Sequence, residues 1–258
     1  MALKRARLER SKQERAAEDL RAQAESVRRN SQAHALRRTL GNLERVNVIA
    51  EFKRASPSKG IIRVDCVPEQ MALAYEAGGA AAISVLTEED RFQGSLEDLR
   101  AIRAAVGIPV LRKDFIFEEY QLYESAAAGA DALLLIVAAL DDETLSRLRR
   151  VAEDELQMDA LVEVHTAEEL RRAAAAGATL VGVNNRDLRS FHVSLDVSEN
   201  LAREATPGVV LVAESGLRSS HDLRRLRAQG YSGFLIGETL MRAVEPEKTL
   251  RKLIEEAG

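Results

Sequence analysis

The sequence has little cysteine, no long apolar run and no strong excess of either charge. Cys66 is its single cysteine, which excludes an intramolecular disulfide and fits a reducing compartment. The longest strongly apolar run, Ala132 to Leu140, is nine residues long. A helix needs about 20 such residues to cross a bilayer. Because the N-terminal segment also has no apolar signal-peptide core, we expect a cytoplasmic protein that does not enter a membrane.

A formal net charge of -4 over 258 residues gives the chain no general positive field. Such a field would be needed to attract nucleic acid or an anionic membrane surface. Hydrophobic residues make up 46% of the chain, which is enough for one large core, and no linker rich in Pro, Gly or Ser divides it. The composition therefore favours a soluble globular enzyme that has no nucleic-acid partner.

Short apolar runs alternate with longer segments of helical periodicity. Eight such runs can be counted: Val46–Lys53, Ala81–Thr87, Ile108–Lys113, Ala132–Val137, Ala160–His165, Leu180–Asn184, Val209–Glu214 and Gly233–Gly237. Glycines such as Gly129 and Gly177 stand between a helical segment and the next run, where a left-handed residue can end a helix. Eight strand-then-helix units predict an α/β fold, the closed (β/α)8 TIM barrel, over residues 46–258.

Residues 1–45 precede the first strand and are expected to form a helical extension of the barrel. Residues 1–30 hold nine Lys or Arg and five Asp or Glu, with only a weak apolar stripe. This excess could mark a contact with a partner, but a solvated helix with paired charges is the favoured interpretation. Leu36, Leu40 and Leu43 are predicted to pack the end of the extension on the barrel.

Polar residues or glycine end most of the expected strands. In the first strand Glu51 and Lys53 share one face with Ile49, and a Ser56-Pro57-Ser58 turn follows. A structural ion pair would explain this strand equally well, but barrel enzymes build their sites at these ends. The predicted strand-end residues are Glu51, Lys53, Ser84, Lys113, Ile136, Glu163, Asn184, Arg186, Glu214, Ser215, Gly216 and Gly237.

Lys113 and Glu163 are the candidates for proton transfer. An ammonium group at a strand end can protonate a developing alkoxide. The apolar neighbours of Glu163 are expected to raise the pKa of its carboxyl group towards that of a useful general acid or base. Each also has a structural interpretation, in which Lys113 pairs with Asp114 and Glu163 pairs with a lysine.

Asn184 and Arg186 offer an uncharged amide and a guanidinium able to bind a carboxylate, although a turn rich in Asn and Asp would have the same sequence. After the last two strands, Ser215-Gly216 and Gly237 could present backbone amides to a phosphate; ordinary turn glycines are the alternative. His165 and His192 are isolated in the sequence, so we expect surface or packing roles for them, and neither a metal nor another cofactor.

The segment Ile49–Gly60, IAEFKRASPSKG, closely resembles the signature of indole-3-glycerol phosphate synthase, the barrel enzyme that closes the indole ring in tryptophan biosynthesis. The resemblance extends over about residues 46–245. It continues in Ser84–Glu88, Leu111–Phe115, Val162–His165, Val183–Leu188 and Ala213–Gly216. It implies a carboxy-lyase that needs no cofactor.

The resemblance implies a substrate, 1-(2-carboxyphenylamino)-1-deoxyribulose 5-phosphate, which yields indole-3-glycerol phosphate, carbon dioxide and water. It also implies that Lys113 protonates the ketone oxygen as the aromatic carbon attacks. Glu163 would be a general acid or base in the later dehydration, and Lys53 would hold the anthranilate carboxylate.

The other residues implied by the resemblance fall into three groups. Those that orient the lysines and the substrate hydroxyls are Glu51, Asn184 and Glu214, with Arg186 close by. Those that hold the phosphate are Ser56, Ser215, Gly216 and Gly237. Those that line the aromatic pocket are Leu86, Phe92, Phe115 and Ile136. Positioning of a flexible substrate would supply much of the rate.

Two other interpretations stay open at this point. Another phosphate-binding barrel, such as phosphoribosylanthranilate isomerase or a Schiff-base aldolase, would share the fold but not the Glu51 and Lys53 pair with its Ser-Pro-Ser turn. A non-catalytic protein that binds a phosphorylated ligand on the same barrel would need no acid and base facing one pocket. We expect the protein to be a monomer.

Overall fold

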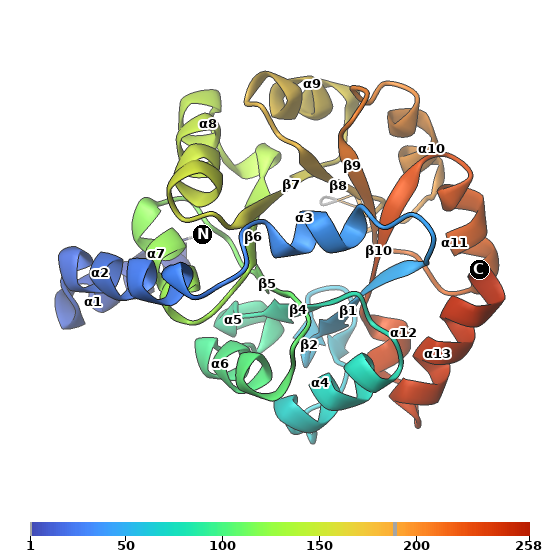
Figure 1. The fold of residues 1–258 in the computed structure, drawn as a ribbon, viewed down its shortest axis with the longest axis horizontal. Coiled ribbons are helices and arrows are strands. Elements are labelled where there is room, and N and C mark those ends of the chain that lie inside the picture. Colours follow the sequence, from blue (N-terminus) through green and yellow to red (C-terminus); the bar gives the residue numbers. More distant parts are fainter. Residues whose placement is uncertain (1, 188–189) are drawn as a thin grey trace.

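The computed structural model describes residues 2–187 and 190–258. Within these ranges, eight parallel strands close into a barrel with helices around it (Figure 1). The strands follow one another around the barrel in chain order, and the last pairs with the first. The predicted (β/α)8 barrel is therefore confirmed.

The barrel strands lie close to the apolar runs that predicted them. They are β1 (Asn47–Phe52), β4 (Ala82–Leu86), β5 (Val110–Lys113), β6 (Ala132–Ile136), β7 (Asp159–Val164), β8 (Leu180–Asn184), β9 (Val210–Glu214) and β10 (Tyr231–Ile236). Strand β10 begins two residues before the expected Gly233. Tyr231 pairs with Leu211 of β9, and its buried side chain donates a hydrogen bond of 2.8 Å from its hydroxyl to the carbonyl oxygen of Ser198.

Helices follow the strands on the outside of the barrel. They are α4 (Pro68–Ala77), α6 (Leu96–Ala105), α7 (Glu119–Ala127), α8 (Asp142–Arg150) with a π-helical turn η2 (Val151–Glu155), α9 (Ala167–Ala175), α10 (Asp196–Ala202), α11 (Ser220–Arg227) and α13 (Pro246–Ala257). Ser95, Thr166 and Ser219 start three of these helices by accepting a hydrogen bond from a backbone amide. The strand-to-helix loops hold the shorter elements β2 (Ala55–Ser56), β3 (Gly60–Ile61), α5 (Glu89–Phe92), η1 (Val137–Ala139) and α12 (Glu238–Met241).

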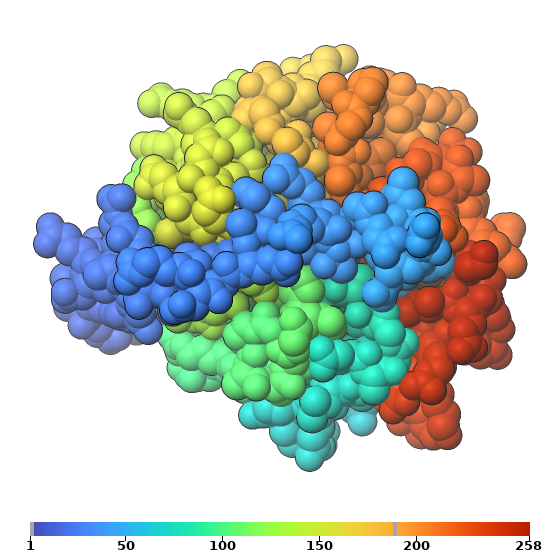
Figure 2. All heavy atoms as spheres, in the orientation of Figure 1, coloured from blue at the N-terminus to red at the C-terminus, as the bar shows by residue number. Residues whose placement is uncertain are grey.

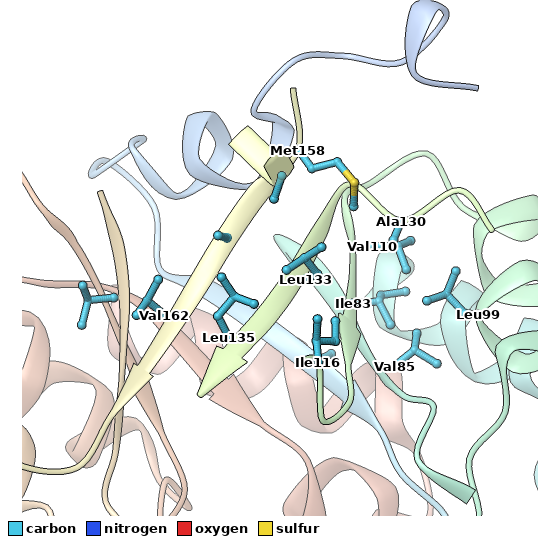
Figure 3. Packing of buried hydrophobic residues seen from close by; sticks show 14 of the residues in the cluster. Ile83, Val85, Leu99, Val110, Ile116, Ala130, Leu133, Leu135, Met158 and Val162 are labelled. Atoms are coloured by element: carbon cyan, nitrogen blue, oxygen red, sulfur yellow. The ribbon is translucent and has the colours of Figure 1, made fainter. Parts of the chain in front are cut away.

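Alternation along the strands separates two apolar clusters. Ile83 and Val85 of β4 and Leu133 of β6 point outward and pack with helix residues such as Leu99 of α6 (Figure 3). Inward-facing residues form the smaller cluster, which includes Ile49, Leu111, Leu134, Leu161, Leu180, Val212 and Leu235. Because both faces of the sheet are buried, the strands read as continuous apolar runs.

The N-terminal extension consists of α1 (Ala2–Glu14), α2 (Ala17–Arg29) and α3 (Ala35–Leu40). Helix α3 lies across one end of the barrel, and the N-terminal segment covers the centre of that face (Figures 1 and 2). Leu36 and Leu40 are fully buried and join the inner cluster, as expected. The prediction for Leu43 was wrong: it lies beyond the end of α3 and is 63% exposed.

Helix α1 reaches the loops at the other end of the barrel. Lys4 Nζ lies 2.6 Å from Asp114 Oδ2, directly after strand β5. Arg7 pairs with Asp90, and Lys12 pairs with Glu118. Among the described residues, no helix combines the length and the apolar character needed to cross a membrane.

Candidate active site

A cavity of about 700 Å³ opens at the carboxyl ends of the strands. Its walls include nearly all of the predicted site residues: Glu51, Lys53, Ser56, Leu86, Phe92, Lys113, Phe115, Ile136, Glu163, Asn184, Arg186, Glu214, Ser215, Gly216 and Gly237. The barrel therefore brings residues from eight separate strand ends to one place.

Ser84 is the exception, because it does not line the cavity. Strand β4 continues to Leu86, so Ser84 lies two residues below the strand end. Its hydroxyl is buried and has no hydrogen-bond partner among the described residues. The prediction placed Ser84 at the strand end because it is the polar residue of an apolar run, whereas the structure places Leu86 there.

The centre of the cavity floor is a cluster of charges from alternate strands. Lys113 of β5 places its Nζ 2.6 Å from Glu214 Oε2 of β9 and 3.3 Å from Glu163 Oε2 of β7. Glu51 of β1 is the fourth member of the group. Since alternate strands of such a barrel contribute inward side chains to one layer, these four residues meet although they are far apart in the sequence.

Burial and the unequal number of charges set the protonation of this cluster. Burial would lower the pKa of Lys113, but the carboxylates of Glu214, Glu163 and Glu51 outweigh it and hold that pKa above its usual value. Burial raises the pKa of Glu214 to about 7, although Lys113 opposes this shift. Lys113 therefore stays an ammonium at neutral pH, while Glu214 is poised to gain or lose a proton.

Glu51 and Lys53 form an ion pair at the end of β1. The structural interpretation of this pair is thus compatible with the functional one, because both side chains line the cavity. Gly237 is the reason that the pair fits: a Cβ there would lie 2.1 Å from Glu51 Oε2 and 3.1 Å from Lys53 Nζ.

Gly182 supports the site from outside the cavity, and the sequence analysis missed it. It lies in β8 beside Glu214, and a Cβ there would lie 2.1 Å from Glu214 Oε1. That oxygen is buried and has no hydrogen-bond partner among the described residues. A glycine inside a buried strand is the signal that could have found this close approach.

Asn185 was also missed, and it holds the loop that carries Asn184 and Arg186. Its Nδ2 donates hydrogen bonds of 3.0 and 3.2 Å to the carbonyl oxygens of Glu214 and Ser215, and its Oδ1 accepts one of 2.8 Å from Ser198 Oγ. Asn184 Oδ1 accepts a hydrogen bond of 3.0 Å from the Arg186 amide. The predicted motif continues to Leu188, which lies outside the described residues.

The loops after β9 and β10 form the far end of the cavity. Ser215 and Gly216 have φ angles of 65° and 84°, and a Cβ on Gly216 would meet Val193 Cγ1 at 2.5 Å. Four cationic side chains that were not predicted also line the cavity: Lys59, Arg91, Arg218 and Arg242. The Glu238 carboxylate is paired with a cation, because Arg242 Nε donates a hydrogen bond of 3.1 Å to Glu238 Oε1.

Comparison with known proteins identifies the family of the chain. A sequence model described as indole-3-glycerol phosphate synthase matches residues 1–253. The chain belongs to the indole-3-glycerol phosphate synthase family. The match includes the N-terminal helices, so it is wider than the expected resemblance over about residues 46–245. The predicted function, a carboxy-lyase of tryptophan biosynthesis that acts on a small phosphorylated substrate, is confirmed.

Individual relatives support the same assignment. The indole-3-glycerol phosphate synthase of Carboxydothermus hydrogenoformans is 53% identical over 213 residues, which are 81% of this chain and 80% of the relative. That of Desulfosudis oleivorans is 51% identical over 207 residues, 80% of this chain and 78% of the relative. Because these relatives are synthases, the comparison favours this function over an isomerase, an aldolase or a non-catalytic binding protein.

A solved structure shows the likeness of fold. The 3-hexulose-6-phosphate synthase of Salmonella typhimurium matches with a TM-score of 0.66 at 15% identity, over 82% of this chain and 98% of that chain. At this identity the likeness concerns the barrel alone.

Within the described part of the chain, no group of three or more His, Cys, Asp and Glu side chains is arranged to hold a metal ion.

Proposed function

We propose that Lys113 is the general acid of ring closure in this indole-3-glycerol phosphate synthase. The observation that carries the proposal is the Lys113 ammonium, held in the cavity at 2.6 Å from Glu214 and 3.3 Å from Glu163. The ring carbon that bears the carboxylate attacks the ketone carbon, and Lys113 gives a proton to the ketone oxygen as the new bond forms. Carbon dioxide then leaves, and its bonding electrons restore the aromatic ring.

We assign Glu163 to the dehydration that completes the indole. The new hydroxyl group leaves as water after it gains a proton, and the neighbouring ring CH2 loses one. The Glu163 carboxyl group lies within reach of Lys113, which needs a proton back after ring closure. The two groups together therefore allow proton transfer in both halves of the reaction. No oxidation or reduction occurs overall, so the proposal includes no redox cofactor.

The remaining residues bind and fold the substrate. Lys53 holds the anthranilate carboxylate, while Glu51, Asn184 and Glu214 orient the lysines and the substrate hydroxyls, with Arg186 beside them. The phosphate binds to the loops of Ser56, Ser215, Gly216 and Gly237. The anthranilate ring lies between the apolar side chains of Leu86, Phe92, Phe115 and Ile136. Charge at the two ends and an apolar middle match a substrate with two anionic ends and an aromatic ring.

A monomer in the cytoplasm that binds no nucleic acid is also proposed. The positive side chains Lys4, Arg7 and Lys12 are engaged by acidic residues of the barrel, which supports this view. We divide the chain into an extension, residues 1–45, and a barrel, residues 46–258. Light scattering coupled to size-exclusion chromatography tests the monomer: a mass near twice the 28.4 kDa of one chain would contradict it.

Indole fluorescence tests the catalytic assignment directly. The chain contains no tryptophan, so emission from the product rises over a tyrosine background. We expect a rise after mixing with the carboxyphenylamino deoxyribulose phosphate, and a fall in kcat of about 10³-fold in Lys113→Ala with substrate affinity nearly unchanged. Lys252→Ala, whose side chain is 74% exposed, is the matched control.

Two outcomes would contradict the proposal. No rise with the unaltered protein would remove the synthase activity from this chain. Full turnover by Lys113→Ala would leave the activity but remove Lys113 as its acid.

A further inference from the structure

His165 lies between two carboxylates at the end of strand β7. Its Nδ1 is 3.2 Å from Glu169 Oε2 of α9, and its Nε2 is 3.5 Å from Glu163 Oε1. The His165 backbone amide also donates a hydrogen bond of 2.7 Å to the same Glu169 oxygen. With a side chain only 11% exposed and Nδ1 bonded to Glu169, the imidazole has a defined orientation.

The inner nitrogen of the ring has no other partner in the described part of the chain. Nε2 is buried and makes no hydrogen bond there, and the atom that faces it is Glu163 Oε1. The second Glu163 oxygen, Oε2, is the one that receives Lys113. Lys113 therefore faces one oxygen of Glu163 and His165 faces the other.

His165 does not line the cavity, whereas Glu163 does. Any effect of the imidazole on the substrate must therefore pass through Glu163. The order of contacts is continuous from Glu169 through His165 and Glu163 to Lys113.

The charges around the imidazole are mostly negative. Glu163 faces it from β7, Glu169 from α9 and Glu214 from β9. Burial alone would lower the pKa of His165, but these carboxylates outweigh burial and raise it. The positive charge of Arg172 on α9 also acts on Glu169, and the Arg172 guanidinium donates a hydrogen bond of 2.6 Å to the carbonyl oxygen of Leu140.

We propose that His165 is a positioning residue that holds the carboxyl group of Glu163 for proton transfer during dehydration. The proposal rests on the role of Glu163 given above. Because Nδ1 faces the Glu169 carboxylate, it carries a proton, and Nε2 is left to share one proton with Glu163 Oε1. A charged imidazole donates to an ionised carboxylate, and a neutral imidazole accepts from a protonated one. The Glu163 carboxyl group thus keeps its orientation in both of its protonation states.

The decisive experiment compares kcat, KM and the pH dependence of kcat in His165→Ala and His165→Asn. For His165→Ala we expect kcat to fall about tenfold with little change in KM, because misplacement of a proton-transfer group affects the chemical step. The pH profile of kcat should also change, since the imidazole that faces the reacting carboxyl group is gone. His165→Asn keeps a donor near Oε1 and recovers part of kcat, but its pH profile should still differ from that of the unaltered protein.

His221→Ala is the matched control, because His221 is exposed on α11. Thermal unfolding of each variant excludes a general loss of structure. A kcat and pH profile within twofold of the unaltered protein in His165→Ala would overturn the proposal, as would a change confined to KM.

Glu163→Gln separates this proposal from the function on which it rests. Loss of turnover in Glu163→Gln with an unaffected His165→Ala rejects the role of His165 alone. Retained turnover in Glu163→Gln rejects the role of Glu163 itself. In the same variant the His165 imidazole, followed by NMR, should titrate at lower pH because one anionic neighbour is gone; an unchanged titration contradicts the contact.

Discussion

The two ends of the barrel use inward-facing side chains in opposite ways. At the closed end, Leu36 and Leu40 of α3 complete an apolar cluster from which water is excluded. At the open end, Lys113, Glu163 and Glu214 concentrate charge on the floor of a cavity. Both layers follow from the same alternation along the same strands. The difference teaches that this barrel places its stability at one end and its chemistry at the other, so changes at each end should have separable effects.

Leu40→Ala should have the largest effect on stability, and it should act on stability alone. The side chain is fully buried in the inner cluster. We expect the free energy of unfolding to fall by about 3 kcal/mol, as for other buried leucines cut to alanine. Urea unfolding measures this change, and kcat per folded molecule should be unaffected.

Leu43→Ala is the control for that prediction, because Leu43 is 63% exposed and should change stability by less than about 0.5 kcal/mol. A large drop in kcat for folded Leu40→Ala would contradict the separation of the two ends.

Gly182→Ala should act at the open end. Its Cβ would lie 2.1 Å from Glu214 Oε1, so the carboxylate must move and Lys113 loses its closest partner. We expect kcat to fall about 10²-fold, since a shift of about 1 Å in catalytic groups has effects of this size. Steady-state kinetics on the folded variant measures it.

Gly107→Ala is the matched control near the start of β5, where the nearest atom to the new Cβ is Glu76 Oε1 at 3.6 Å. It should retain nearly full activity. Equal losses of kcat in Gly182→Ala and Gly107→Ala would contradict the prediction, because the loss would then not depend on contact between the new Cβ and Glu214.

The raised pKa of Glu214 predicts a pH dependence of stability. A carboxyl group with a pKa of 4.5 in its ordinary state and about 7 in the folded protein binds its proton more tightly when folded. Its contribution is fully present below pH 4.5 and is lost as pH rises through about 7. Between pH 5 and pH 7 we expect a loss of about 2 kcal/mol, because each pKa unit corresponds to about 1.4 kcal/mol and most of the shift is titrated in this range.

Urea unfolding at several pH values between 5 and 7 measures this slope. In Glu214→Gln the side chain no longer titrates, so the slope should become smaller while kcat also falls. An equal slope in both proteins would show that Glu214 titrates normally in the folded state.

Lys4→Ala should have the smallest effect. Lys4 contacts Asp114 beside Lys113, yet Asp114 also accepts hydrogen bonds from Thr87 and Arg112. We expect a loss of about 1 kcal/mol in stability and less than a twofold change in kcat. A tenfold fall in kcat would instead mean that α1 positions Lys113, and the extension would then serve both ends of the barrel.

The sequence by itself determined the strands and most of the strand-end residues. It also determined that Leu36 and Leu40 of the extension pack on the barrel. Periodicity and the position of polar residues after apolar runs carry this information locally. The motif at Ile49–Gly60 is specific enough to indicate the family on its own, because it combines a charged strand end with a Ser-Pro-Ser turn at fixed spacing.

The tertiary structure alone decided which of these groups meet. Strand β4 runs past Ser84 to Leu86, which removes Ser84 from the cavity, and Gly182 matters only because Glu214 lies against it. His165 looked isolated along the chain, yet the turn from β7 into α9 places it between Glu163 and Glu169. The pattern along the chain shows which chemical group each residue carries and which face of its element it occupies. The distances between groups on different strands are set only when the barrel closes.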